Sequence, residues 1–173
     1  MPATQLTKHL AAALKEPSPN LKTALRLCDA WTSYSYDTMK AIIDECVVDD
    51  YVWNALPESI ILPGWNQMKK SEFIEAFGTA WWPAMKGMQM IVLNMVENEN
   101  NVILYTKLGP SAVSAEGNPI ATSYVHRFRF NASGKVVEQR DFLDTKFIHD
   151  FWWSEPQRSI VAEGSPIAAG GNR

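Results

Sequence analysis

Residues 124–144 read YVHRFRFNASGKVVEQRDFLD, which is the pattern of two β-strands joined by a tight turn. Before the turn, Tyr124, His126 and the two phenylalanines that follow occupy every second position, and arginines lie between them. Such alternation is typical of an antiparallel strand with one buried face. In the turn, Gly134 can adopt the positive φ that a short hairpin loop needs. The stretch therefore predicts a β-hairpin.

The apolar face of this hairpin carries a histidine and an aspartate. In the expected register His126 lies opposite Gln139, and Asp141 is a diagonal neighbour of His126 on the same face. An aspartate desolvated by an apolar interior is a suitable general base, and a histidine beside it can act as the acid or orient the aspartate. We therefore predict that His126 and Asp141 are catalytic. A register slip of one residue would instead bring Arg140 and Asp144 inward.

A structural interpretation of the same face stays open. Four charged residues have the outward parity, namely Arg127, Arg129, Glu138 and Arg140. We expect them to form a cross-strand charge ladder or a dimer surface. Under the structural interpretation, Asp141 pairs with one of these arginines, or Asp141 and His126 satisfy only each other.

The composition indicates one globular domain that binds a small molecule. Of the 173 residues, 46% are apolar and 20% are charged. Seven tryptophans, seven phenylalanines and five tyrosines favour a pocket lined by aromatic rings. The net charge of −3 gives no basic footprint for nucleic acid, and no basic amphipathic helix indicates a membrane surface. We expect a hydrophobic small molecule as the partner, without nucleic acid or membrane.

The cysteines and the chain ends indicate a cytoplasmic protein. Cys28 and Cys46 lie in helical patterns without metal-site spacing, so we expect buried, reduced thiols. The sequence has no His-Glu-x-x-His motif, and we expect no metal. It also shows no signal-peptide pattern and no apolar run near the ~20 residues of a membrane span.

The order of the predicted elements defines the fold class. Helices are expected over 21–34, 38–46, from 69–71 to 81, and over 147–153. Strands are expected over 47–56, 87–97, 102–114 and the two arms of the hairpin. Helices gathered before a run of strands predict an α+β fold. We expect one domain over residues 20–153, an N-terminal extension over 1–19 and a flexible tail over 154–173.

Several segments together resemble a known family. They are Trp31–Asp37, Val48–Trp53, Trp82–Pro83 and the hairpin continued to Phe147. Over residues 21–152 the chain resembles the SnoaL-like branch of the nuclear-transport-factor-2-like (NTF2-like) superfamily. The resemblance implies a cone-shaped, curved antiparallel sheet wrapped around three N-terminal helices. It also implies a homodimer through the outer face of the sheet, and a concave inner side that can hold a ligand.

The resemblance implies an enzyme that needs no cofactor. Members of the superfamily isomerise, cyclise or dehydrate carbonyl-bearing polyketide or terpenoid intermediates of secondary metabolism. Its cyclases place an inward histidine and an inward aspartate on the last strands as acid and base, which implies these roles for His126 and Asp141. Non-catalytic binding or dimerisation modules share the fold. A closed cavity holding both residues would favour an enzyme, whereas a cone filled by Trp and Met side chains would favour a scaffold.

Two further activities of the superfamily match less well. Epoxide-hydrolase-like members use an Asp–Arg–Asp set with a tyrosine and an asparagine, but Tyr51 and Asn54 have opposite parity here and the charged set has no clean match. Scytalone-dehydratase-like members use two pocket histidines, whereas His9 and His149 lie in terminal segments.

Aromatic side chains are the candidates for substrate binding. Tyr51 and Tyr124 can donate a hydrogen bond to a carbonyl group, whereas Tyr105 shares the parity of Lys107 and is expected to face water. Four methionines are flexible enough for an adaptable pocket or an interface: Met85, Met88, Met90 and Met95. The predicted substrate-binding residues are Trp31, Tyr34, Tyr51, Trp53, Trp81, Tyr124 and Phe128.

Overall fold

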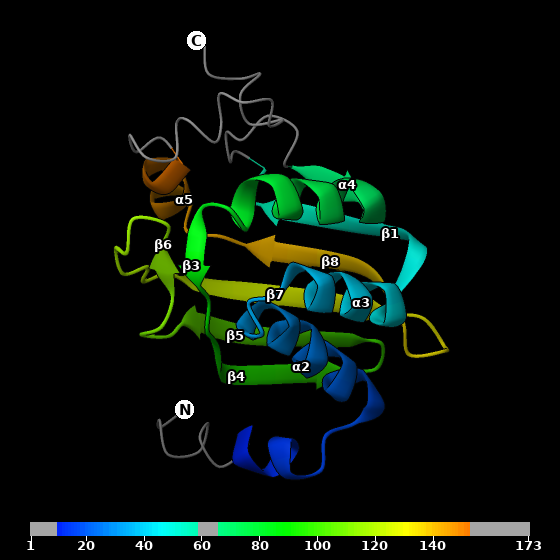
Figure 1. The fold of residues 1–173 in the computed structure, drawn as a ribbon. Helices are drawn as coiled ribbons and strands as arrows, with labels where there is room; N and C mark the ends of the chain where they lie inside the picture. The colour runs from blue at the N-terminus through cyan, green and yellow to red at the C-terminus, as the bar shows by residue number, and fades with distance from the viewer. Residues whose placement is uncertain (1–9, 59–65, 153–173) are drawn as a thin grey trace.

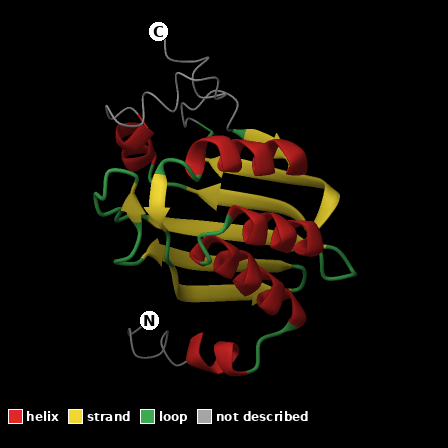
Figure 2. Cartoon of the chain, viewed as in Figure 1, coloured by secondary structure: helices red, strands yellow, loops and turns green. Residues whose placement is uncertain are grey.

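The structure is a computed structural model that describes residues 10–58 and 66–152. The expected tail over 154–173 and His9 lie outside these ranges. Two layers make up the described part, with helices α2, α3 and α4 in front of one face of a large curved sheet (Figures 1 and 2). This arrangement confirms the predicted α+β fold.

The helices match the predicted order. They are α2 (Pro19–Thr32), α3 (Tyr36–Cys46), α4 (Lys70–Ala76) and α5 (Thr145–Trp152). After α4 the chain continues as a π-helical segment, η1 (Phe77–Trp81), before Pro83 ends the helical region. Each of α2, α3 and α4 buries apolar side chains against the sheet.

Short polar side chains cap three of these helices. Ser18, Ser35 and Asp144 each accept a hydrogen bond from the backbone N–H three residues later, at 3.0, 3.3 and 2.9 Å. Asp144 therefore begins α5. It is exposed and does not turn into the interior, the alternative that a register slip would have produced.

The sheet has six strands in the order β2-β1-β8-β7-β5-β4. They are β1 (Val47–Leu56), β2 (Gln67–Lys69), β4 (Met90–Asn98), β5 (Asn101–Leu108), β7 (Ser123–Phe130) and β8 (Val136–Phe142). Neighbouring strands are antiparallel except β1 and β8, which run parallel. The expected antiparallel sheet therefore contains one parallel pair, because the last strand pairs with the first.

The strand expected over 102–114 is shorter than predicted. β5 ends at Leu108, because Gly109 and Pro110 follow and a proline cannot donate to the strand ladder. The next residues form β6 (Val113–Ser114), which pairs with β3 (Met85–Gly87) in a separate two-stranded sheet.

β7 and β8 form the predicted hairpin, but with a different register. His126 lies opposite Asp141, whereas the expected partner of His126 was Gln139. The predicted diagonal relationship is therefore wrong, and the two residues face each other directly. Asp141 still points inward and is buried, and Arg140 is exposed.

Two one-residue offsets produce this register. Phe130 pairs with Val136, one residue beyond the expected partner, because the side chain of Asn131 folds the loop by accepting backbone N–H groups of later loop residues. Val137 is then an extra residue in the ladder, a β-bulge. Since a shift of two residues preserves the face of a strand, the inward set is as predicted.

The outer face of the hairpin carries the predicted charge ladder. Arg129 and Arg140 both form ion pairs with Glu138, at 2.9 and 2.7 Å. Arg127 donates to the side-chain oxygen of Asn101 at 3.0 and 3.2 Å. None of these arginines forms the ion pair with Asp141 that the structural interpretation allowed.

Two further expectations concern the cysteines and the membrane. Cys28 and Cys46 are buried free thiols, as predicted. Within residues 10–58 and 66–152, no helix combines the length and the hydrophobicity that a bilayer crossing requires.

Candidate active site

His126 and Asp141 form a hydrogen-bonded pair on the inner face of the sheet. Nδ1 of His126 lies 2.8 Å from Oδ1 of Asp141, and the residues are only 6% and 7% exposed. The imidazole lies between two aromatic rings of the same strand, Tyr124 at 5.5 Å and Phe128 at 6.2 Å between ring centres. Stacking on both sides fixes the ring plane, so the nitrogen atoms point along the sheet toward β8 and β5.

Two further donors bind the carboxylate of Asp141. The indole N–H of Trp53 donates to Oδ2 at 2.7 Å. Nε2 of Gln139 donates to both carboxylate oxygens, at 3.0 and 2.8 Å. Together with His126, these contacts occupy the roughly four acceptor positions that a carboxylate has. The surrounding donors therefore match an ionised Asp141, which is an acceptor only.

The network extends to a tyrosine on β1 and a threonine on β5. The hydroxyl of Tyr51 donates to Oε1 of Gln139 at 3.0 Å. Nε2 of His126 lies 3.0 Å from the hydroxyl of Thr106, which can donate to a neutral imidazole or accept from a protonated one. Four neighbouring strands thus contribute to one buried polar network inside an apolar core.

Burial keeps the other ionisable groups near Asp141 neutral. Burial first, and then the negative charge of Asp141, raises the pKa of Tyr51, Tyr124 and Cys28 above their ordinary values. The two phenols therefore stay protonated and remain donors. The Cys28 thiol is a poor nucleophile for the same reason.

A small cavity adjoins the pair. It has a volume of about 60 Å³, and His126 and Asp141 both line it. Its other lining residues are Trp31, Trp53, Phe77, Trp81, Met88, Met90, Tyr124, Leu143 and Ile148. A single water needs at least ~10–15 Å³ of such space, so the cavity as it stands has room for a few waters.

The hydroxyl of Tyr124 faces this cavity and has no hydrogen-bond partner among the residues that the structure describes. Tyr124 is 7% exposed, and its hydroxyl oxygen is buried without a hydrogen bond. An unpaired buried hydroxyl costs free energy, so it marks a position where a ligand acceptor would gain a hydrogen bond. The cavity thus presents a phenol donor, an imidazole and a carboxylate to one small space.

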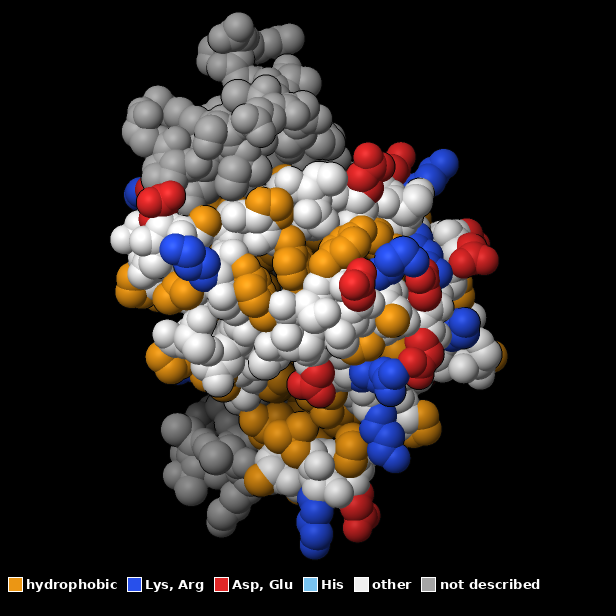
Figure 3. Space-filling model, in the orientation of Figure 1, with side chains coloured by type: hydrophobic (Ala, Val, Ile, Leu, Met, Phe, Trp, Pro, Cys, Tyr) orange, Lys and Arg blue, Asp and Glu red, His pale blue; other side chains and the backbone are white. Residues whose placement is uncertain are grey.

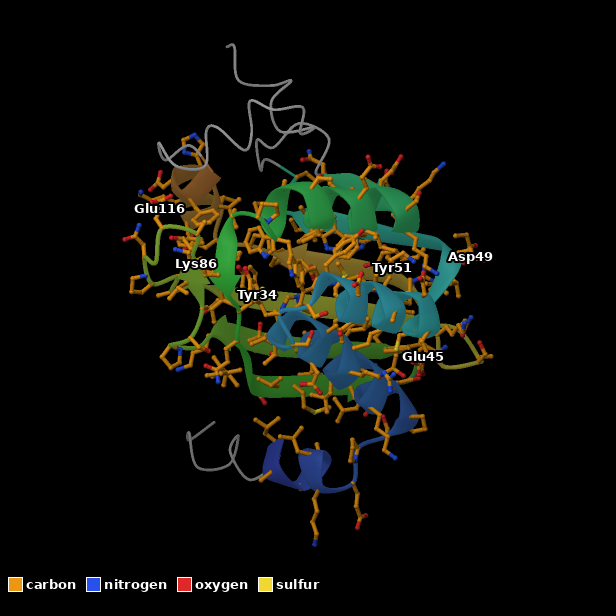
Figure 4. All side chains as sticks on the ribbon, viewed as in Figure 1. Tyr34, Glu45, Asp49, Tyr51, Lys86 and Glu116 are labelled. Atoms are coloured by element: carbon orange, nitrogen blue, oxygen red, sulfur yellow. The ribbon has the colours of Figure 1, made fainter. Side chains whose placement is uncertain are left out.

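Four of the seven predicted substrate-binding residues line the cavity: Trp31, Trp53, Trp81 and Tyr124. The other three have different surroundings. Tyr51 belongs to the polar network, and Phe128 packs on the far side of His126. Tyr34 is not part of the lining; its hydroxyl donates to the backbone oxygen of Met85, and its ring stacks on Trp82. Tyr34 and Tyr51 are labelled in Figure 4.

Sequence reasoning missed Gln139 and Thr106 as members of the network. Their inward parity was a usable signal, because a polar residue on a buried strand face needs a partner. The tyrosine and asparagine of the epoxide-hydrolase arrangement do not come together, since Tyr51 is buried on the inner face and Asn54 lies partly exposed on the other. Tyr105 is exposed on the outer face, as predicted.

A larger groove lies elsewhere, between α3 and α4. It measures about 620 Å³ and contains none of the predicted site residues. Four of its five charged side chains pair with one another: Lys70 lies 3.3 Å from both Asp44 and Asp49, and Lys40 lies 2.7 Å from Asp44. Figure 3 shows acidic and basic side chains close together over these helices. Because most of its charges are already paired, this groove is a weaker candidate than the cavity.

Comparison with known proteins agrees with the fold. The sequence model of the SnoaL-like domain matches residues 24–139, which is more than half of the chain. The chain therefore belongs to the SnoaL-like domain family. No curated protein matches the chain significantly.

Solved structures share the fold at low sequence identity. The BvnE pinacolase from Penicillium brevicompactum is 17% identical over 84% of this chain and 97% of that chain, with a TM-score of 0.66. PrhC from Penicillium brasilianum is 13% identical over 88% and 95%, with a TM-score of 0.69. TerC, co-crystallised with polyporic acid, is 19% identical over 79% and 100%, with a TM-score of 0.63. At these identities the similarity establishes the fold alone.

Proposed function

We propose that this protein is a cofactor-free acid–base enzyme that isomerises, cyclises or dehydrates a hydrophobic small molecule bearing a carbonyl group. The observation that carries the proposal is the unpaired hydroxyl of Tyr124 in the same cavity as the His126–Asp141 pair. Family membership and the pinacolase among the structural relatives support an enzyme of secondary metabolism.

In the proposed reaction the substrate carbonyl accepts a hydrogen bond from Tyr124. This donor stabilises the negative charge that develops on the oxygen when a proton leaves the neighbouring carbon. Asp141 takes that proton as general base, and His126 holds the carboxylate and stabilises its charge. The C–H electron pair becomes the C=C bond of an enolate, and the proton stays on Asp141 until it is returned or passed on.

When Asp141 takes up the substrate proton, one of its carboxylate oxygens must give up a hydrogen bond that it accepts in the free protein. Gln139 suits this exchange, because its amide nitrogen contacts both carboxylate oxygens and keeps one contact when the other is lost. Trp53 and His126 each hold a single oxygen. Gln139 thus stays bound to Asp141 when one carboxylate oxygen takes up the proton.

The small cavity volume favours a second candidate function, a non-catalytic module that binds a hydrophobic ligand or dimerises. Pockets for drug-sized ligands measure about 300–1,000 Å³, far more than the 60 Å³ here. A substrate must therefore displace wall residues, and the flexible Met88 and Met90 are suited to move. Leu143, which lies shortly before α5, and Ile148, which lies within α5, form another part of the wall.

A homodimer through the outer face of the sheet is part of the proposal. Tyr105, Val125 and Phe142 lie side by side across β5, β7 and β8 on the face opposite the helices. Tyr105 and Phe142 are 41% and 51% exposed. An exposed apolar row on a sheet face supports self-association.

Turnover of a ketone panel tests the enzyme proposal. The panel contains apolar aromatic and terpenoid ketones, and products are detected by mass spectrometry. We expect conversion by the native protein and a loss of about 100-fold or more in Asp141→Asn with an unchanged circular dichroism spectrum. Equal activity of the two proteins would exclude Asp141 as the base. Saturable binding of the panel without conversion would favour the binding module.

A further inference from the structure

Tyr51, Gln139 and Asp141 form a directional chain of hydrogen bonds. Tyr51 donates to Oε1 of Gln139 at 3.0 Å, and Nε2 of Gln139 donates to the carboxylate at 3.0 and 2.8 Å. All three residues are buried, and the chain crosses from β1 to β8. The carboxylate therefore receives an amide whose direction is set by a residue on the neighbouring strand.

Tyr51 favours that direction because its buried hydroxyl has a proton to donate, and Oε1 of Gln139 is the acceptor. Burial, and then the charge of Asp141, raises the pKa of Tyr51 well above its ordinary value, so the phenol keeps its proton. If the amide turned over, Oε1 would face the carboxylate oxygens. The phenol oxygen could then accept from the amide, but the phenol proton would lose its acceptor.

The direction of the amide depends on the protonation state of Asp141. An ionised carboxylate only accepts, so it requires the N–H side of Gln139. A protonated carboxyl group could instead donate to Oε1 of a turned amide. By holding the N–H side toward Asp141, Tyr51 favours the ionised form.

We propose that Tyr51 and Gln139 are a positioning pair that keeps Asp141 ionised and, through it, keeps a proton on Nδ1 of His126. The inference rests on the proposed function only in that the same carboxylate accepts the substrate proton. Its consequence is that a neutral His126 carries its proton on Nδ1 and leaves Nε2 as an acceptor. Thr106 accommodates both states, because its hydroxyl donates to the neutral ring and accepts from the charged one.

The other groups that face Asp141 do not obscure this effect. They are Cys28 on α2, Tyr51 on β1 and Tyr124 on β7, and the charge of Asp141 contributes to the raised pKa of each. All three therefore stay neutral through the acid range. Among the described side chains, His126 is the basic group that contacts Asp141.

The test follows the ring nitrogens of His126 by ¹⁵N NMR over a pH series, in the protein without ligand. His126→Asn identifies the signals among those of the three histidines of the chain. We expect Nδ1 to stay protonated at both ends of the titration while Nε2 titrates. A native protein with its neutral proton on Nε2 would overturn the proposal.

Two variants, Tyr51→Phe and Gln139→Met, test whether Tyr51 acts on Asp141 through Gln139 or only supports the fold. Losing the Tyr51 hydroxyl weakens the donor to the anion, so we expect the titration of the pair to move to higher pH by about one unit. Tyr105→Phe, the same change on the outer face, should cause no shift. In a Gln139→Met background, Tyr51→Phe should add no further shift, because Tyr51 acts through Gln139.

Two outcomes would contradict this assignment. An unchanged titration in folded Tyr51→Phe would show that the hydroxyl does not influence Asp141. The same shift with and without Gln139 would show that Tyr51 acts directly or through altered packing. Thermal melting establishes that each variant is folded. Since no substrate is used, a failure of the proposed reaction would leave these results standing.

Discussion

Asp141 lies directly opposite His126 on the neighbouring strand, and Nδ1 of His126 is 2.8 Å from Oδ1 of Asp141. Opposite residues of an antiparallel pair have their Cβ atoms about 4.5–5.5 Å apart, which suits a direct hydrogen bond between short side chains. The β-bulge at Val137 and the five-residue loop before β8 create this juxtaposition. The same loop therefore determines both the hairpin and the candidate chemistry.

Tyr124→Phe is expected to separate stability from activity. The variant removes a buried hydroxyl that has no partner, so the free energy of unfolding should stay equal or rise by about 1 kcal/mol. Loss of the donor to the developing oxyanion should lower kcat by about 100-fold. Denaturant unfolding and turnover of a converted ketone measure the two effects.

The control for this variant is Tyr51→Phe, whose hydroxyl does have a partner, Gln139. It should destabilise the protein by about 1 kcal/mol. Equal destabilisation by both variants would show that the Tyr124 hydroxyl is already satisfied in the free protein.

Met88→Ala is expected to enlarge the cavity at a cost in stability. Met88 is buried and lines the cavity, so its truncation should cost about 2–5 kcal/mol and increase the binding of an apolar fluorescent dye. Met85 is equally buried but does not line the cavity, which makes Met85→Ala the matched control. If both variants bound the dye equally, the added binding would come from general loosening of the fold.

Phe142→Lys tests the outer face of the sheet. If copies of the chain associate through the row of Tyr105, Val125 and Phe142, a charge at the most exposed member should shift the molar mass in light scattering from dimer to monomer. Leu14→Lys changes another exposed apolar residue, which precedes α2 and belongs to no strand of the sheet, and should leave the mass unchanged. A native protein that is monomeric at high concentration would refute the dimer.

Glu138 gives the stability a predictable dependence on pH. Partial burial raises the pKa of Glu138, but the hydrogen bonds and charges of Arg129 and Arg140 outweigh burial and hold the pKa below its ordinary value. The ionised form therefore stabilises the fold above the unfolded-state pKa, and this contribution is lost as the pH falls through the folded-state pKa.

Glu138→Gln should accordingly lower the melting temperature at neutral pH by about 2–4 °C, the equivalent of about 1 kcal/mol. The difference from the native protein should vanish in acid, where Glu138 is protonated in both states. A difference that stays constant with pH would mean that packing, and not charge, is responsible.

Periodicity in the sequence predicted on which face of a strand a residue lies better than it predicted which residues that side chain contacts. The alternation around His126 and Asp141 identified the inward set, because the parity of a strand is a local property. It could not identify Thr106 as the neighbour of His126, because that contact depends on how strands align. Gln139 lies two residues before Asp141 on β8, so parity placed both on one face, but the donation to Asp141 depends on the side-chain rotamers. The parallel pairing of β1 with β8, which brings Trp53 and Tyr51 to the site, is likewise set by the whole fold.

The volume of the cavity also lay beyond the sequence. It depends on how Trp81, Met88 and other large side chains fill the space between the helices and the sheet. Tyr34 illustrates the same difficulty, since as an aromatic residue it was a predicted substrate-binding residue, but its hydroxyl donates to the backbone oxygen of Met85. Rotamers of large side chains are determined by their neighbours, which a single sequence does not reveal.

The central claim is that Asp141 removes a proton from the carbon beside a carbonyl group. Solvent deuterium exchange tests it most directly, because it detects proton abstraction even when no net product forms. Apolar ketones are incubated with the protein in D₂O, and incorporation of deuterium at the α-carbon is followed by NMR. We expect exchange with the native protein and a loss of about 100-fold or more in Asp141→Asn. Exchange by Asp141→Asn at the native rate would contradict it.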